Sequence, residues 1–387
     1  MDLVRILFSS LPGHGHTYPL LPLAIAARAA GHDIMFATGA EFHPTLRDLG
    51  FEAIAAGKSF EEARLEVMGQ ADRADSLEGE ELQRALLEIF GVLLPRSFAV
   101  DLRPVLAERK PDLVVAEVGN PGAGLAAIDA GIPVVRHGFG REMTAEFGEL
   151  VGAGLRRCAA ELGIALADGD LGPGAPTLDI CPPSFQEPET VGAPNRMPLR
   201  PVPFNPPGEL PAGVRRDERD RPLVYLTLGT AFGVAEVLRA AIAGLATLDV
   251  DVLVAAGPSL QGAALGTMPP GVRVESWVPQ GELLPHADLV VHHGGSGTTL
   301  GSFGVGVPQL FLPQGADQFE NAAAVVAAGA GDQLVGAEQT AEAVAAKAKR
   351  LLTDEPVLAA ARRFADEVAA MPTPAEVAEQ LPALAAS

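Results

Sequence analysis

One stretch constrains the fold of this chain more than any other. Leu289-Val-Val-His-His-Gly-Gly-Ser-Gly-Thr-Thr299 joins a short apolar run to a glycine turn and then to hydroxyl residues. The apolar run predicts a strand covered on both faces, and the glycines permit a tight turn with close backbone approach. The hydroxyl residues open a helix, whose unpaired N–H groups favour an anion. The stretch therefore indicates either a phosphate-binding turn or a glycine turn that only packs a helix against a sheet.

The chain has 387 residues, which is too long for one ordinary core, so two domains are expected. Apolar runs predict strands at Val4–Phe8, Asp33–Ala37, Phe51–Ala55, Asp112–Ala116 and Ile132–Val135, and again at Leu223–Thr227, Val250–Ala255, Val272–Val278, Leu289–His292 and Gln309–Leu312. Helical segments lie between these strands in both halves. The alternation predicts an α/β protein with two Rossmann-like domains, whose ligands bind at the carboxyl ends of the strands.

The predicted domain boundaries follow from composition. Residues 1–205 form the N-terminal domain, and residues 223–370 form the C-terminal domain. Residues 206–222 are rich in proline and charge, which is typical of a solvated linker. Residues 371–387 are expected to form a helical tail that packs back on the N-terminal domain.

Charge and cysteine content exclude several classes of protein. The formal net charge of −21 argues against a nucleic-acid or anionic-membrane partner, since both require clustered Lys and Arg. Cys158 and Cys181 form neither a disulfide framework nor a metal-binding spacing, so both are interpreted as small buried side chains. The sequence contains no signal-peptide pattern and no membrane-length apolar run, and a cytoplasmic location is expected.

Two further segments resemble a known family. Trp277-Val-Pro-Gln280 ends one predicted strand, and Pro313-Gln-Gly-Ala-Asp-Gln318 ends another. Together with His293-Gly-Gly-Ser-Gly-Thr298, these segments resemble the nucleotide-sugar glycosyltransferases of bacterial antibiotic biosynthesis, including the macrolide and calicheamicin types. The resemblance implies a GT-B fold, in which two Rossmann-like domains face a central cleft. It covers nearly the whole chain.

The resemblance also implies roles for the C-terminal domain in binding a dTDP-sugar donor. The residues implied to hold the diphosphate are Thr230, His293, Gly295, Ser296, Gly297 and Thr298. Trp277 would stack on the nucleobase, although burial in the core is the alternative. Val278 would meet the base edge through its backbone, and Gln280 would reach the ribose. Asp317 and Gln318 would hold the sugar hydroxyls.

For the N-terminal domain, the resemblance implies that His16 in Gly15-His-Thr-Tyr-Pro19 is the catalytic base. Imidazole can take a proton near neutral pH. Glu117, at the end of a predicted strand, would be its partner carboxylate where many relatives carry Asp. His14 is a rival base two residues away, and a loop histidine with a structural hydrogen bond is the other alternative.

The resemblance implies that the acceptor is a bulky, hydrophobic natural-product aglycone. Phe60, Phe90, Met143 and Phe147 are candidates to line its pocket, although such residues are more often ordinary core. Gly119 and Pro182-Pro-Ser-Phe185 favour an enediyne-type enzyme.

Some patterns point to other ligands. Gly122-Ala-Gly-Leu-Ala-Ala127 matches a dinucleotide fingerprint, but it follows a middle strand and has no acidic strand end about twenty residues further on. Close helix packing is the preferred interpretation. His14 and His16 lie in one predicted domain, whereas His292 and His293 lie in the other, so a shared zinc site is not expected. No metal and no other cofactor are expected.

The combined prediction is an inverting glycosyltransferase, monomeric or homodimeric, that moves a deoxysugar from a dTDP-sugar to an aglycone hydroxyl, with an enediyne or polyketide as the aglycone. Inversion follows because the sequence offers a single base and no evident nucleophile. Two alternatives remain open. A nucleotide-sugar epimerase of the same fold would need no acceptor, and a non-catalytic sugar-nucleotide-binding protein would need no base.

Overall fold

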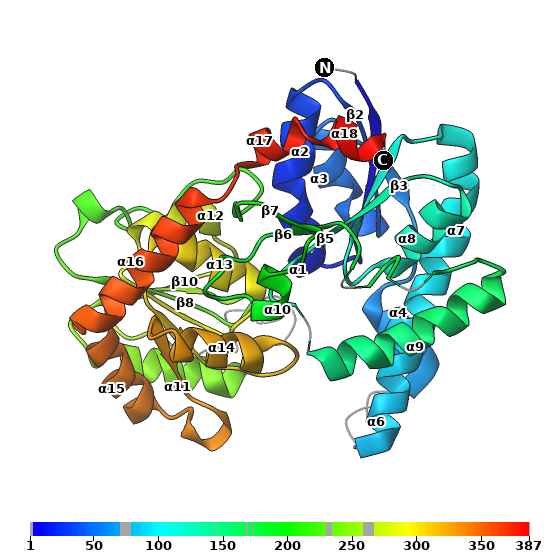
Figure 1. Ribbon diagram of the computed structural model, residues 1–387. Coiled ribbons are helices and arrows are strands. Elements are labelled where there is room, and N and C mark those ends of the chain that lie inside the picture. The colour runs from blue at the N-terminus through cyan, green and yellow to red at the C-terminus, as the bar shows by residue number, and fades with distance from the viewer. Residues whose placement is uncertain are drawn as a thin grey trace. The chain divides into compact units, whose positions relative to one another are not determined.

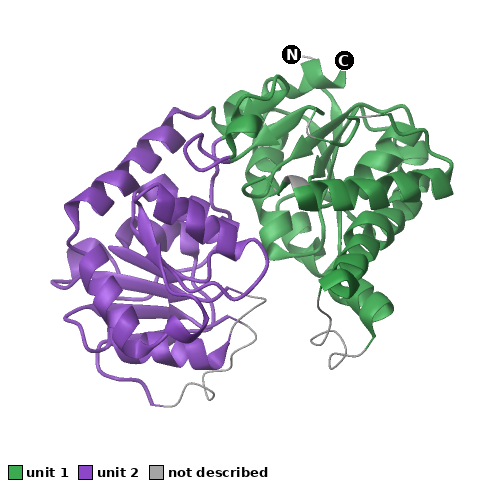
Figure 2. Ribbon diagram, turned by 60° about the horizontal axis from the view of Figure 1, so that its bottom comes forward, with its two compact units in different colours: residues 1–180, 187–199, 372–387 green, residues 181–186, 200–371 purple. Residues whose placement is uncertain are grey.

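The protein consists of two compact units, each with its own parallel sheet (Figure 1, Figure 2). The computed structural model describes residues 3–69, 79–142, 144–167, 169–172, 174–229, 234–257 and 267–386. Unit 1 comprises residues 1–180, 187–199 and 372–387, and unit 2 comprises residues 181–186 and 200–371.

The sheet of unit 1 has the strand order β3-β2-β1-β4-β5-β6-β7, and all of its pairings are parallel. Its strands are β1 (Arg5–Ser9), β2 (Asp33–Thr38), β3 (Glu52–Ala55), β4 (Leu113–Glu117), β5 (Val134–His137), β6 (Thr177–Asp179) and β7 (Arg196–Pro198). The central strand β4 is buried along its whole length, which explains its apolar sequence. The sequence predicts the first five strands but misses β6 and β7, which are too short to show a pattern.

Helices cover this sheet. They are α1 (His14–Thr17), α2 (Leu21–Ala29), α3 (His43–Asp48), α4 (Phe60–Met68), α6 (Gly79–Leu86), α7 (Leu94–Arg109), α8 (Pro121–Asp129), α9 (Ala145–Leu162) and α10 (Pro188–Val191), with short 3₁₀ turns at Tyr18–Leu20 and Ala40–Phe42. A π-helical segment, Leu87–Leu93, joins α6 to α7. This segment crosses α9 closely, because a Cβ on Gly91 would lie only 2.9 Å from the Gly154 Cα. The crossing holds the π-helical segment firmly against α9.

The sheet of unit 2 has the order β10-β9-β8-β11-β12-β13 and is also parallel. Its strands are β8 (Leu223–Thr227), β9 (Asp251–Ala255), β10 (Val272–Glu275), β11 (Leu289–His292), β12 (Gln309–Phe311) and β13 (Gly331–Gln333). The strand order reverses direction between β8 and β11, so ligands are expected beyond the carboxyl ends of these two strands. The sequence misses β13, a three-residue edge strand.

The helices of unit 2 pack their apolar faces on this sheet. They are α11 (Ala235–Leu245), α12 (Gln280–Leu283), α13 (Ser296–Val305), α14 (Gln318–Ala327), α15 (Ala341–Leu351) and α16 (Glu355–Ala370), with 3₁₀ turns at Arg216–Glu218, Leu284–His286 and Gly336–Glu338. Helices α11 and α15 touch directly, since a Cβ on Gly244 would lie 2.2 Å from the Ala341 carbonyl oxygen.

The C-terminal residues return to unit 1. Helix α17 (Pro374–Ala378) packs against α2, and α18 (Leu381–Ala385) packs against β4. These helices are the red segments beside α2 in Figure 1.

The structure differs from the predicted boundaries at the linker. Residues 200–205 and 181–186 belong to unit 2, not to the N-terminal domain. Residues 206–222 also lie on unit 2, where Arg216 and Arg219 each pair with Asp288 at 2.8 Å. The Arg219 side chain is only 6% exposed, whereas that of Arg216 is 60% exposed, so the segment predicted as a solvated linker has both buried and solvated charges. A run of charges has the same sequence pattern whether its side chains are paired or solvated.

Candidate active site

The glycine turn after β11 is built by backbone geometry that needs glycine. Gly294 has a φ of 100°, and a Cβ there would lie 2.8 Å from the Gln318 carbonyl oxygen. Gly295 is extended and precedes α13 directly. No described side chain caps the first turn of α13, so its N–H groups remain available to an anion.

His292, the last residue of β11, supports this turn from inside. It is fully buried, and its Nδ1 accepts a hydrogen bond from the Gly294 N–H at 3.2 Å. Its Nε2 therefore carries the proton and donates to Gln309 Oε1 at 2.9 Å. Burial, and next the neighbouring His293, lower the pKa of His292 to about 3, so the ring is neutral at physiological pH.

His293 has a different environment, at the edge of the turn. Its ring is packed against the backbone, since a Cβ on Gly295 would lie 2.5 Å from His293 Nε2. Its Nδ1 has no hydrogen-bond partner among the described residues. Burial lowers the pKa of His293 to about 4, although Asp317 acts in the opposite direction. Of the two adjacent histidines, His293 is the one with an unused ring nitrogen at the turn.

Asp317 is joined to the turn by hydrogen bonds. Its Oδ2 accepts from Ser296 Oγ at 2.9 Å and from Asn321 Nδ2 at 3.0 Å. Its neighbour Gln318 is only 2% exposed. The Gln318 side-chain oxygen accepts from the backbone N–H groups of Gln314 (2.8 Å) and Gly315 (3.2 Å). Asp317 is thus the exposed member of the predicted sugar-binding pair, and Gln318 holds the loop before it.

Trp277 is not a core residue, because it is 45% exposed. One edge of its six-membered ring lies against Gly208, where a Cβ would come within 2.9 Å of Trp277 Cζ3. Gly208 belongs to the segment predicted as linker, and no local pattern indicates that it lies beside Trp277. The adjacent Val278 is buried. The indole therefore combines a fixed edge with exposed surface, as a stacking platform requires.

Gln280, three residues after Trp277, is hydrogen-bonded to the helix that follows the glycine turn. Its Oε1 accepts from Thr298 Oγ1 at 3.1 Å, in the first turn of α13, and from Tyr225 OH at 3.4 Å. Burial raises the pKa of Tyr225 far above its ordinary value, so this hydroxyl stays a donor. Unit 2 thus joins Gln280, which lies in the same segment as Trp277, to Tyr225 and Thr298 by hydrogen bonds.

In unit 1, the structure pairs His16 with Glu117. His16 lies in α1, and its Nδ1 is 3.3 Å from Glu117 Oε1. Glu117 is fully buried at the end of β4, where it accepts hydrogen bonds from the N–H groups of Gly119 (2.5 Å) and Leu11 (3.3 Å). These bonds fix the orientation of the carboxylate. At this ion-pair distance the carboxylate can stabilise an imidazolium.

Among the residues that the structure describes, none places a carboxylate within salt-bridge distance of the His14 ring. It packs edge-on against Tyr18 and Phe42, with ring centroids 4.9 and 5.2 Å away. Burial lowers its pKa, although Glu41 acts in the opposite direction. Of the two rivals, His16 has the geometry of an oriented base.

Two neighbours of this pair were missed by the sequence analysis. Phe139 lies 4.7 Å from the His16 ring, and His137 is the β-sheet register partner of Glu117. His137 is fully buried, and burial lowers its pKa to about 4, while Glu117 acts in the opposite direction. The only sequence feature that could have identified His137 as a site residue is its position at the end of a strand.

Three of the four acceptor candidates form a cluster. Phe60 and Phe90 stack with centroids 5.5 Å apart, and Phe147 meets Phe90 edge-on at 6.2 Å. They come from α4, the π-helical segment and α9, and Phe60 is 42% exposed. The fourth candidate, Met143, and the predicted diphosphate residue Thr230 lie outside the described residues.

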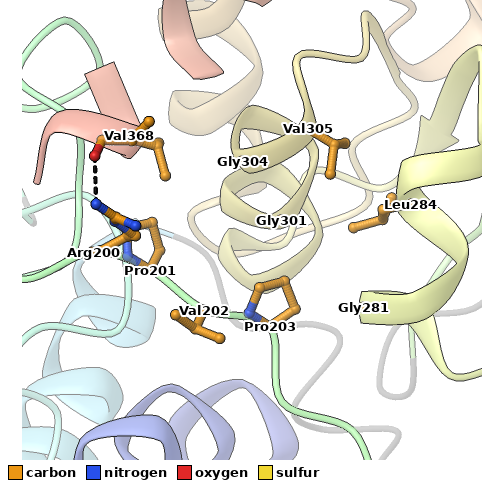
Figure 3. A pocket seen from close by; sticks show the side chains of 11 residues that line it. Arg200, Pro201, Val202, Pro203, Gly281, Leu284, Gly301, Gly304, Val305 and Val368 are labelled. Atoms are coloured by element: carbon orange, nitrogen blue, oxygen red, sulfur yellow. Dashed lines mark hydrogen bonds between the residues drawn. The ribbon is translucent and has the colours of Figure 1, made fainter. Parts of the chain in front are cut away.

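A shallow pocket of about 220 Å³ lies elsewhere in unit 2 (Figure 3). Its walls are Arg200–Pro203 and residues of α12, α13 and α16. Because Gly301 and Gly304 line it, this pocket lies one to two turns along α13 from the glycine turn. It contains none of the predicted site residues.

Within the ranges that the structure describes, no group of three His, Cys, Asp or Glu side chains is placed to hold a metal ion. None of the described helices is long and apolar enough to cross a membrane.

Most of the chain matches a known family. Residues 25–229 match the N-terminal domain and residues 239–384 the C-terminal domain of the proteins described as erythromycin biosynthesis protein CIII-like. The L-demethylnoviosyl transferase of Streptomyces niveus is 35% identical over 98% of both chains. The crystal structure of the glycosyltransferase SsfS6 from Streptomyces sp. SF2575, complexed with thymidine diphosphate, has a TM-score of 0.80 and 28% identity, covering 98% of this chain and 99% of that one.

The calicheamicin glycosyltransferase CalG4 shares the fold, with a TM-score of 0.81 at 23% identity over 99% of this chain and 98% of that one. The two parallel sheets and these matches define a GT-B glycosyltransferase. The chain belongs to the erythromycin biosynthesis protein CIII-like family of antibiotic glycosyltransferases. The predicted GT-B fold class and the predicted enzyme class are confirmed.

Proposed function

We propose that the protein transfers a deoxysugar from a dTDP-sugar to a hydroxyl group of a hydrophobic natural-product aglycone, with inversion at the anomeric carbon. The observation that carries the proposal is the 3.3 Å separation between His16 Nδ1 and the buried Glu117 carboxylate. A carboxylate at one ring nitrogen leaves the other nitrogen unprotonated and able to accept a proton.

In the proposed reaction, the acceptor hydroxyl oxygen forms a bond to the anomeric carbon while the bond from that carbon to the diphosphate oxygen breaks. The hydroxyl proton moves to His16 Nε2, and Glu117 stabilises the resulting imidazolium. The bonding electron pair leaves with the diphosphate. One displacement at carbon, with no covalent enzyme intermediate, inverts the configuration.

The donor side of the proposal rests on the turn before α13. Its uncapped N–H groups and the unused Nδ1 of His293 are placed to take up charge on the leaving diphosphate. Thymidine is the proposed nucleoside because SsfS6, a relative of the same fold, was crystallised with thymidine diphosphate. Trp277 would stack on the base, and Asp317 would accept hydrogen bonds from sugar hydroxyls.

The proposed acceptor surface is the cluster of Phe60, Phe90 and Phe147. Three aromatic rings from three helical segments, one of them well exposed, suit a large apolar aglycone. Enediyne and polyketide aglycones both meet this description. We further propose that the reaction needs no metal, because backbone N–H groups and His293 supply the positive potential at the diphosphate.

The test is to incubate the protein with thymidine-diphosphate sugars and a panel of polyketide and enediyne aglycones, with and without a chelator. Mass spectrometry should detect a glycosylated aglycone together with released thymidine diphosphate. Conversion of the sugar nucleotide without any acceptor would instead identify the epimerase alternative. Binding without turnover of any donor would support the non-catalytic alternative.

A further inference from the structure

Asn321 is a buried amide that the sequence analysis did not single out. It lies in α14, one turn after Asp317, and its side chain is 0% exposed. Its Nδ2 lies 3.0 Å from the Gly294 carbonyl oxygen, 3.1 Å from Ser296 Oγ and 3.0 Å from Asp317 Oδ2. The amide therefore contacts both parts of the candidate donor site, which come from different strand ends.

The contact with Gly294 has a consequence for the next N–H group. In a trans peptide, the C=O and N–H bonds of one peptide unit point in opposite directions. Because Asn321 holds the Gly294 carbonyl inward, the N–H of Gly295 must point away from Asn321. No described residue accepts a hydrogen bond from that N–H. The Gly294 N–H is meanwhile held by His292 Nδ1, so both sides of this residue are fixed.

The contact with Asp317 determines which carboxylate oxygen remains available. Asp317 Oδ2 already accepts from Ser296 Oγ and Asn321 Nδ2. Those two bonds fix the rotation of the carboxylate, so Oδ1 is the oxygen left for a hydroxyl of a ligand. One amide thus sets the direction of an anion-binding N–H and the direction of a hydroxyl-binding oxygen.

We infer that Asn321 is a positioning residue that couples the diphosphate-binding turn to the sugar-binding carboxylate. This inference rests on the proposed donor. Asn321 acts through its neighbours, because its side chain is fully buried beneath them. Loss of the amide should therefore weaken two kinds of recognition together, one for the diphosphate and one for the sugar.

The variant Asn321→Asp tests this coupling, because it keeps the shape but replaces the NH₂ donor with a carboxylate oxygen. That oxygen faces the Gly294 carbonyl and the Asp317 carboxylate, so both contacts become repulsive at pH 8. Calorimetric titration with thymidine diphosphate should show affinity about 10–100-fold weaker than wild type, in line with the loss of two hydrogen bonds.

Two comparisons separate positioning from a merely structural role. Asp317→Asn should weaken binding of a thymidine-diphosphate sugar but leave thymidine diphosphate alone unchanged within about twofold, whereas Asn321→Asp weakens both. Asn120→Asp is the matched control, because Asn120 is a buried asparagine of unit 1 whose Nδ2 donates to Ser9 Oγ at 2.9 Å. It should bind thymidine diphosphate as wild type does.

Where Asn321→Asp does not fold, Asn321→Ala removes the donor without adding charge and should still weaken thymidine diphosphate binding. A folded Asn321 variant that binds thymidine diphosphate and its sugar derivative as tightly as wild type overturns the inference and leaves the proposed function intact. If wild type itself fails to bind thymidine diphosphate, the proposed donor is wrong, and the inference falls with it.

Discussion

Two helices of this molecule begin with glycine-rich turns after buried strands, and they use their glycines differently. In α8, a Cβ on Gly122 would lie 2.2 Å from the Pro95 carbonyl oxygen, and one on Gly124 would lie 2.5 Å from Leu171 Cδ2. In α13, a Cβ on Gly297 would meet no atom of the described residues within 4 Å. Gly122 and Gly124 allow neighbouring residues to pack closely against α8. At Gly297, by contrast, no described residue lies close enough to need a glycine.

The comparison shows what decides the use of a glycine turn. The interpretation of Gly122–Ala127 as close helix packing is confirmed, because the neighbour is the backbone of α7. That neighbour comes from a segment about 25 residues earlier, so the local pattern cannot reveal it. At the start of α8 the polar chemistry lies instead in Glu117, just before the helix, which pairs with His16. Unit 1 therefore carries the proposed base, and unit 2 carries the proposed donor turn.

The largest expected effect is on catalysis, and it separates the proposed base in unit 1 from the proposed donor turn in unit 2. General-base assistance contributes typically about 10²–10⁴-fold, so His16→Ala should lower kcat by that factor. Thymidine diphosphate affinity should not change, because the donor turn belongs to unit 2. Glu117→Gln should fall between wild type and His16→Ala. His14→Ala is the matched control, and a dead His14 variant beside an active His16→Ala would contradict the assignment.

The second effect concerns acid stability. Burial holds the pKa values of His137, His292 and His293 at about 3 to 4, below the value of about 6.5 expected in the unfolded chain. Between these values the unfolded state binds more protons, so the free energy of unfolding falls as the pH drops from 6.5 towards 4. Each histidine contributes up to about 1.4 kcal/mol per pH unit in that window.

Two of these three histidines lie in unit 2 and one in unit 1, where burial also lowers the pKa of His14, but by less. Hydrogen exchange measured at pH 7 and pH 5 should therefore show a larger loss of protection in the strands of unit 2. Equal loss in both units would show that other groups control the acid response.

The third prediction addresses packing at α8. Gly122→Ala forces a methyl group into the Pro95 backbone and should lower the free energy of unfolding by about 1–3 kcal/mol, as overpacking does. Gly297→Ala adds a methyl group where the protein leaves space, and helix propensity should raise stability by up to about 1 kcal/mol. Denaturant unfolding of both variants measures the difference, and a well-tolerated Gly122→Ala would refute the packing role.

The fourth prediction concerns Trp277, where a change of similar size is expected in the free energy of ligand binding. If the indole stacks on the base, Trp277→Ala should weaken thymidine diphosphate binding by about 1–3 kcal/mol. The melting temperature should change little, because the side chain is 45% exposed, whereas a fully buried tryptophan would cost about 3–5 kcal/mol. Unchanged affinity in a folded variant would remove the stacking role.

The sequence predicted the long buried strands and the residues that follow them. Strands such as β4 and β11 are unbroken apolar runs, and their ends supplied Glu117 and His293. Strands of three residues carry too little pattern, which is why β6, β7 and β13 were missed. Asn321 was missed for another reason, because an amide in an alanine-rich helix has no local feature that reveals its three partners.

The most direct test of the account is a calorimetric titration of thymidine diphosphate into wild type, Gly122→Ala and Gly297→Ala. No described atom lies within 4 Å of a Cβ on Gly297, and the diphosphate is proposed to bind at this helix N-terminus. A methyl group there should therefore exclude the diphosphate sterically and weaken binding about tenfold or more. Gly122→Ala should bind as wild type once folded. Wild-type protein that does not bind thymidine diphosphate, or a Gly297→Ala variant that binds it equally well, would contradict the account.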